Sequence, residues 1–327
     1  MSSPNGHINI ALLGKTMAQY SQIMADEYNA VRTKVKSIVE TGTGDKGYGG
    51  TMSSSDVQKG DMITELQFDN LRSDIDKAVR HQTGLVSALT NVSSGTVIYW
   101  ATLVSYDLKA DEITTNRDNA YTGATTGSYV KQLDVVNGGS TTLSSGWGVN
   151  SANQTKGTQS YNITFTTADK ARYFFNSGGY LKLTFSRNSP GSPNTKTVGW
   201  EGIIDNLSAQ AFTFDKTKYR QGVAGTTTVW SYQKNDTTNP YTENYGYMRF
   251  KYVDSTTIGV SIQLVDADKG DTPQPPAAGA GPAVDETVGI DITAGLEYRK
   301  SIDQFVAETP TFTIPAWTLS ASTSTTA

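Results

Sequence analysis

The chain has 327 residues, a formal net charge of −4 and no cysteine, and only 18% of its residues are charged. Without cysteine it can form neither disulfides nor thiolate metal sites. The sequence has no cluster of lysine and arginine of the kind that neutralises phosphates, so direct binding to nucleic acid is not expected. The length favours more than one domain, because single cores usually stop growing near ~250 residues.

The start of the chain predicts neither export nor a membrane span. Residues 1–13 have no basic region, so they do not match a signal peptide. No stretch approaches the ~18 to 20 apolar residues that are needed to cross a bilayer. We therefore expect a protein that is neither secreted by the usual route nor inserted in a membrane.

Residues 23–84 contain an internal repeat, in which the segment 23–44 aligns with 63–84. In each copy an aromatic and three aliphatic residues recur at helical spacing, as on one face of an amphipathic helix. These residues are Tyr28, Val31, Val35 and Val39 in the first copy and Phe68, Leu71, Ile75 and Val79 in the second. Thr64 and Gln67 offer a capping box at the start of the second helix.

Two lone helices bury little surface, so we expect them to pack on each other and on a neighbouring chain. The eight residues of the repeated face are therefore the predicted assembly interface. Arg32 and Arg72 recur at equivalent positions, where each either bridges to a carboxylate or is solvated on a helix face; solvation is favoured, because exposed ion pairs contribute little. Residues 42–60, rich in Gly and Ser, predict a loop between the helices.

The segment that follows the repeat is ambiguous. Apolar residues at helical spacing favour a third helix over 97–121, whereas 97–99 would suit a strand. The helical face would consist of Trp100, Leu103, Val104, Leu108 and Ile113. Residues 122–160 predict short strands and long turns, and we expect a domain boundary near residue 122.

Residues 161–187 predict a strand, a short helix and a second strand. The two strands are indicated by strict alternation of apolar and polar residues over 161–166 and 181–186. Thr167 is placed to cap the helix, and Gly178 and Gly179 are placed to end it in a left-handed conformation. This segment is expected to hold the core of the C-terminal two-thirds of the chain.

The rest of the chain predicts a short helix over 200–207 and several strands with one wet face. The expected strands are 212–214, 248–252, 260–264, 288–292, 297–306 and 312–319. The overall expectation is a mainly β chain with α: a helical assembly domain (1–121), a β-sandwich-like antiparallel domain with short helices (122–269), a Pro/Gly linker (270–283) and C-terminal strands with a flexible tail (284–327).

Motifs that could mark a reactive site each have a simpler explanation. The G-x-G-x-x-G match at 42–47 lacks a strand before it and a helix after it. Asp266, Asp268 and Asp271 are spaced as in a calcium loop, but no glutamate closes the pattern, and cation binding there is left open. His81 falls in the last turn of a helix, where it complements the helix dipole.

Paired carboxylates for glycoside hydrolysis are also considered. Such a pair needs one carboxyl group whose pKa is raised above that of the other. Four acidic residues of the C-terminal part have no neighbours in sequence that would raise the pKa of one of them in this way: Asp205, Glu243, Asp254 and Glu286. We expect no enzyme activity, no catalytic residue, no cofactor and no metal site. Tyrosines such as Tyr245 and Tyr247 suit sugar stacking, a protein interface or cross-strand packing, and the sequence leaves the three open.

Residues 171–179 (ARYFFNSGG), with the Thr-rich strand before them and the segment 199–207 after them, resemble a stretch in virion structural proteins of tailed phages, cyanophages in particular. The resemblance implies a virion component that is assembled in the host cytoplasm. A tail fibre or baseplate protein is the first expectation; a neck, collar or capsid-decorating protein, or a glycan-binding receptor module, is the alternative. The expected partners are other virion proteins, further copies of the chain in a homo-oligomer such as a trimer, and host-surface glycan.

Overall fold

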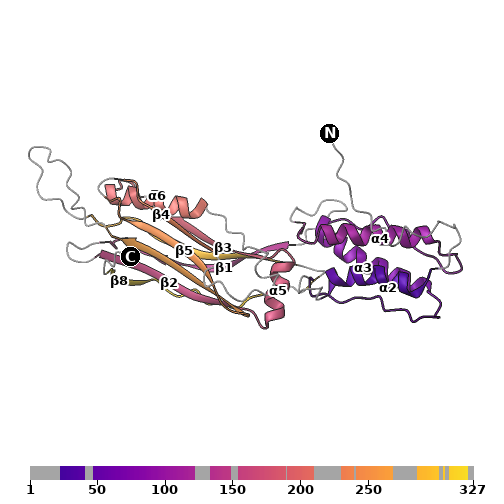
Figure 1. Cartoon of the computed structure of the whole chain (residues 1–327). Helices are drawn as coiled ribbons and strands as arrows, with labels where there is room; N and C mark the ends of the chain where they lie inside the picture. Colours follow the sequence, from indigo (N-terminus) through magenta and orange to yellow (C-terminus); the bar gives the residue numbers. More distant parts are fainter. Residues whose placement is uncertain are drawn as a thin grey trace, which may run out of the picture.

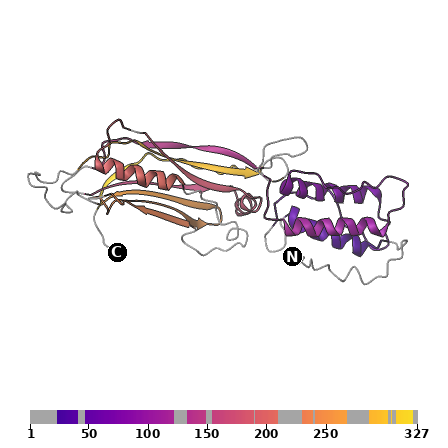
Figure 2. The same cartoon turned by 90° about the horizontal axis from the view of Figure 1, so that it is seen from above.

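The computed structural model describes residues 23–40, 47–121, 133–148, 154–188, 190–209, 230–238, 241–267, 286–301, 305 and 309–322. A helical region is followed by a β-rich region with two antiparallel sheets, which confirms the expected fold class. The two regions follow one another along an elongated molecule (Figures 1 and 2). The expected strand at 212–214 and the expected linker at 270–283 lie outside the described residues.

The described part of the N-terminal region contains three helices: α2 (Ala25–Val39), α3 (Glu65–Thr83) and α4 (Trp100–Thr115). Helix α3 begins with the expected capping box of Thr64 and Gln67 and ends at Gly84, whose φ of 76° is left-handed. Helix α4 confirms the expected third helix, but its face differs. Leu108 is exposed, and the buried stripe runs instead through Tyr106 and Ala110.

All three helices run in the same direction. The hydroxyl of Tyr28, near the start of α2, donates to the carbonyl of Gln67 near the start of α3 at 2.8 Å. At the other end, the Gln82 amide of α3 donates to the carbonyl of Ile113 in α4, also at 2.8 Å. Parallel neighbours need a return connection about as long as the helix, and residues 47–64 and 85–99 supply it. The sequence repeat therefore covers the helices α2 and α3, and the return segment between them sets its spacing along the chain.

The repeated arginines are ion-paired, so the expectation of solvated side chains is wrong. The buried Arg32 guanidinium donates to the carbonyl of Ser54 and pairs with Asp56 at 2.5 Å. Arg72 pairs with Asp76 at 3.3 Å. Arg32 thus ties α2 to the return segment, because its partners lie on that segment.

The β-rich region contains a three-stranded and a five-stranded antiparallel sheet. The first has the order β1 (Leu133–Leu143), β7 (Ile292–Ser301), β3 (Tyr180–Arg187). The second has the order β4 (Trp230–Asn235), β5 (Tyr245–Asp254), β6 (Thr257–Asp266), β2 (Gln154–Thr164), β8 (Thr318–Ser322). β7, which is central in its sheet, begins only at Ile292, the last residue of the strand expected at 288–292, and covers 297–301 of the strand expected at 297–306. Before it, Val288 forms an isolated bridge with Trp147.

The expected strand–helix–strand segment is confirmed as β2, α5 (Ala168–Asn176) and β3. Thr167 caps α5 by accepting from the Lys170 amide at 3.1 Å, and Gly178 has a φ of 87°. Because β2 and β3 belong to different sheets, α5 carries the chain from one sheet to the other. Phe165 and Phe174 pack at this crossing with ring centroids 5.2 Å apart, so the segment does lie in the core.

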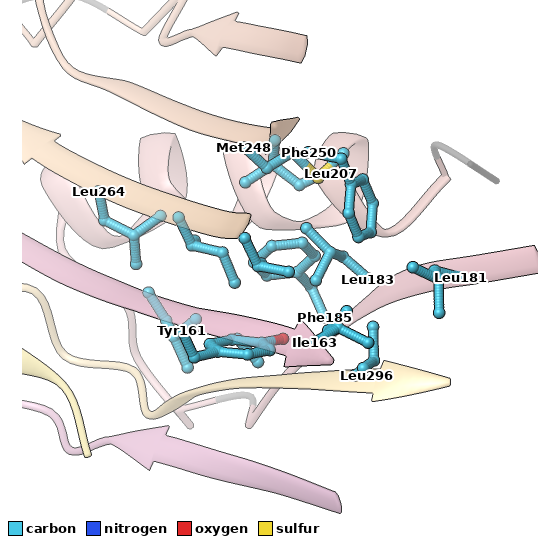
Figure 3. Packing of buried hydrophobic residues seen from close by; sticks show 14 of the residues in the cluster. Tyr161, Ile163, Leu181, Leu183, Phe185, Leu207, Met248, Phe250, Leu264 and Leu296 are labelled. Carbon is cyan, nitrogen blue, oxygen red and sulfur yellow. The ribbon is translucent and has the colours of Figure 1, made fainter. Parts of the chain in front are cut away.

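Helix α6 (Thr195–Ala209) closes one side of the sandwich. It packs on β3 of the small sheet and on β4 and β5 of the large one. The four residues at expected helical spacing are all buried: Trp200, Ile203, Ile204 and Leu207. Figure 3 shows Leu207 beside Met248 and Phe250 of the large sheet. The helix begins at Thr195, earlier than the sequence pattern indicates.

Candidate assembly surface

The helical region meets the β-rich region at the C-terminal ends of its helices. The Gln82 amide at the end of α3 donates to the Tyr48 hydroxyl at 3.0 Å. The Tyr48 ring packs on Phe305, which follows β7, with centroids 4.8 Å apart. Asn176 of α5 donates to the Gly47 carbonyl at 2.9 Å. Since the helices are parallel, their N-terminal ends lie at the opposite end of the described helical region, which is called its free end because no described residue of the β-rich region packs there.

A groove of about 810 Å³ lies at this free end, lined by Ile23 and by residues of the segments 60–68 and 92–99. Three apolar side chains of its lining are exposed to an unusual degree: Met62 by 82%, Val97 by 69% and Leu66 by 67%. Single exposed apolar residues are ordinary, whereas a contiguous group around a hollow marks an interaction site. We call this feature the tip groove.

The tip groove carries negative charge. Asp61 and Glu65 are the charged residues among its described lining, and no lysine or arginine lines it. Its rim is held in shape by the start of α3, where the Thr64 backbone amide donates to the Gln67 side chain at 2.7 Å. The groove is thus an apolar hollow with an acidic rim on a fixed helix terminus.

The floor beneath the tip groove is a packed aromatic cluster. The Phe68 ring lies 5.7 Å from that of Tyr28 and 5.4 Å from that of Tyr106. Burial raises the pKa of the Tyr106 hydroxyl to about 12, and burial likewise raises the pKa of Tyr28. Tyr106 donates to the Thr90 carbonyl at 3.2 Å, which fastens the second return segment to α4.

The eight residues predicted as an assembly interface line the interior of the helical region instead. Each is at most 5% exposed, and they pack in one cluster with residues of α4. Their side chains are therefore not accessible to a second chain in this structure. Helical periodicity predicted the apolar face correctly, but it could not show that a third helix of the same chain covers it.

The exposed residues of the tip groove were missed because they precede or start a helix. Met62 and Val97 lie in return segments, where no periodicity applies, and Leu66 is in the first turn of α3 on the side opposite Phe68. An apolar residue next to a helix start is the signal that could have indicated them.

The remaining candidate site residues either pack or pair inside the protein or lie outside the described residues. His81 is wholly buried and packs on the rings of Tyr48 and Phe305, with centroids 4.8 and 5.0 Å away. Asp266 is buried and pairs with Lys196 at 2.8 Å. Asp268, Asp271 and residues 42–46 are not described. Within the described ranges no group of three or more His, Cys, Asp and Glu side chains is arranged to hold a metal ion.

Three of the four carboxylates considered for hydrolysis, Asp205, Asp254 and Glu286, are held by local partners. Asp205 accepts from the Arg187 guanidinium at 2.9 Å. Glu286 accepts from the backbone amide of Lys196 at 3.0 Å. The backbone N–H of Thr256 donates to Asp254 and lowers the pKa of that carboxyl, the opposite of what a general acid needs.

Among the described helices none is long and apolar enough to cross a membrane. Comparisons with protein-family models, with curated proteins and with solved structures found no match.

Proposed function

We propose that the chain is a structural component of a phage particle and that the tip groove is its attachment surface. The single observation that carries this proposal is the position of the groove. Within the described residues, it lies at the end of the helical region opposite the one that packs on the β-rich region through Tyr48 and Phe305. An exposed apolar hollow at a molecular end suits attachment of one rigid body to another.

The chemistry of the groove indicates the kind of partner. Its apolar floor takes apolar side chains, and Asp61 and Glu65 favour a partner with lysine or arginine beside them. The partner is thus a basic amphipathic segment of another particle protein. Contact between the grooves of two copies would bring like charges together, so another protein is favoured over a second copy at this surface.

Within the particle, a tail fibre or baseplate position is the first choice, and a neck, collar or capsid-decorating position is the alternative. This choice comes from the resemblance of residues 171–179, which form α5 and the turn after it. These residues are mostly buried and contact the helical region through Tyr173 and Asn176. The resemblance therefore covers the part of the chain that joins its two regions.

Photo-cross-linking in assembled particles tests the proposal. A photo-reactive amino acid is introduced at position 62 in the genome of the virus that encodes the chain, and cross-linked peptides are identified in purified particles. The matched control position is Val253, which is 47% exposed in the β-rich region. We expect position 62, and not position 253, to cross-link to a lysine- or arginine-bearing segment of another particle protein. Particles without the chain, or equal cross-linking from both positions, would contradict the proposal.

A further inference from the structure

The five-stranded sheet has one face in the core and one directed away from it. On β5, Met248 and Phe250 are wholly buried in the cluster that contains Leu207 of α6 (Figure 3). Successive side chains of a strand point to opposite faces. The outward face of β5 therefore carries the alternate residues Tyr245, Tyr247, Arg249 and Lys251.

The strand register places further polar side chains beside these four. Tyr247 is opposite Gln233 of β4 on one side and opposite Gln263 of β6 on the other. Lys156 of β2 lies on the same face, on the row of Tyr245. We call this surface the cationic face and define it by Lys156, Gln233, Tyr245, Tyr247, Arg249, Lys251 and Gln263.

The charge of this face differs from that of the whole chain. It has three cations although the chain has a formal net charge of −4. The two aspartates at the ends of these strands do not neutralise it. Asp254 is held in the hairpin turn by Thr256, and Asp266 points inward to Lys196. A local excess of one charge sign concentrates ligands of the opposite sign.

Arg249 is the cation with the strongest indication of a ligand. Among the described residues no acceptor is placed for its buried Nε atom, and no ion pair joins it to a described carboxylate, whereas Arg187 on the other sheet is paired with Glu201 and Asp205. A guanidinium presents a planar fork of donors that matches a carboxylate or a sulfate. The Arg249 side chain follows Tyr247 and precedes Lys251 on this face of β5, and because its Nε atom is buried, an anion would bind at the terminal nitrogens of the guanidinium.

The other side chains of the face suit a hydroxylated ligand better than a protein surface. Exposed apolar surface lies only at one end of the face, where Val253, 47% exposed, is beside Lys251. Val265, the aliphatic residue on the row of Tyr245, is 3% exposed, so the middle of the face is not the apolar centre of a protein interface. Tyrosine offers a flat apolar ring with a polar edge, and glutamine amides both donate and accept. From Tyr245 to Lys251 the face extends roughly 20 Å, which is long enough for several sugar rings.

The geometry points to a binding site for an anionic polysaccharide on the cationic face. Sugar rings stack on Tyr245 and Tyr247, the amides of Gln233 and Gln263 bind hydroxyl groups, and Arg249 binds a carboxylate or sulfate of the chain. This inference does not depend on the tip groove, which lies in the helical region. A particle protein with this face would bind acidic glycan at a host surface or in its surroundings.

Isothermal titration calorimetry of the full chain with an oligomer of uronic acid tests the inference. The same titration is made with a neutral glucose oligomer and with single-stranded DNA of similar length. We expect binding of the uronate that weakens with salt and falls roughly tenfold in Arg249→Gln, because a charge-assisted hydrogen bond is lost. The neutral oligomer and the DNA are expected to bind more weakly.

Two further variants keep the test decisive. Lys182→Gln removes a cation from β3 of the other sheet and is expected to leave uronate binding unchanged. Lys251→Gln, at an exposed position of the cationic face, repeats the test should Arg249→Gln unfold. The inference would be overturned by no uronate binding, by equal loss in Lys182→Gln and the two face variants, or by binding of DNA or neutral glucan as tightly as uronate.

Discussion

The Lys196 ammonium lies 2.8 Å from Asp266 Oδ2, and both side chains are buried. The same ammonium donates to the Gly148 carbonyl at 2.7 Å and lies 5.3 Å from the centre of the Tyr241 ring. Lys196 is in the first turn of α6, and Asp266 ends β6. The pair therefore fixes the start of α6 to the end of the large sheet, inside the protein.

Removing one member of this pair is expected to destabilise the protein strongly. Lys196→Met leaves the Asp266 carboxylate buried without its cation, which costs about 3–5 kcal/mol of the free energy of unfolding. The double variant Lys196→Met with Asp266→Leu should recover most of that loss, because no buried charge remains. Urea unfolding measures both. Arg187→Gln, at a more exposed ion pair, should cost less than about 1 kcal/mol. A single variant no less stable than the double variant would contradict this account.

Gly49 is expected to be essential to the contact between the helical and β-rich regions. It has a φ of 76°, and a Cβ atom there would lie 2.2 Å from the ring of Tyr173 in α5. Gly60 also has a positive φ, of 95°, but faces open space, so it is the matched control. Gly60→Ala should lower the free energy of unfolding by the backbone strain alone, about 1–2 kcal/mol. Gly49→Ala adds overpacking and should cost about 3 kcal/mol or more, measured by calorimetry. Equal costs would show that the close approach of Tyr173 is unimportant.

The stability of the protein should fall with rising pH between about 10 and 12. The pKa of Tyr106 is raised to about 12 from the ordinary value of 10.0, because burial disfavours the charged phenolate. Its contribution is fully present below pH 10 and is lost as the pH rises toward 12, since only the unfolded chain releases the proton in that window. Tyr106→Phe should therefore lose less stability over this range than the wild type, in urea unfolding at each pH. Tyr99→Phe, at an exposed tyrosine, should behave as the wild type does.

Much of the helical region could be predicted from local signals. The face of α2 and α3 follows from the spacing of residues such as Val31 and Leu71, and the start of α3 follows from the capping box of Thr64 and Gln67. Neither the parallel direction of the helices nor the element that covers the apolar face could be predicted, because periodicity shows only which side of a helix is apolar. For that reason the repeated face was expected at an interface between chains rather than against α4.

The β-rich region was predictable strand by strand but not as sheets. The alternation around Ile163 and Leu183 predicts two strands, yet both patterns are equally compatible with one sheet or two. The pairing of β7 with both β1 and β3 joins residues far apart in the sequence, such as Tyr298 with Val136 and Leu181. In the other sheet, the register of β5 on β6 creates the cationic face, because Tyr247 and Gln263 become neighbours only through it.

The most direct test of the attachment proposal is the number of copies of the chain in each particle. The double variant Met62→Ser with Leu66→Ser changes two side chains that are 82% and 67% exposed, so the free energy of unfolding should change by less than about 1 kcal/mol. Val253→Ser is the control at an exposed position of the β-rich region. Quantitative mass spectrometry of purified particles should find the double variant depleted roughly tenfold, as expected when about 1.4 kcal/mol or more of binding free energy is lost. The control should be present at the wild-type level. A folded double variant that enters particles as well as the control would contradict the attachment role of the tip groove.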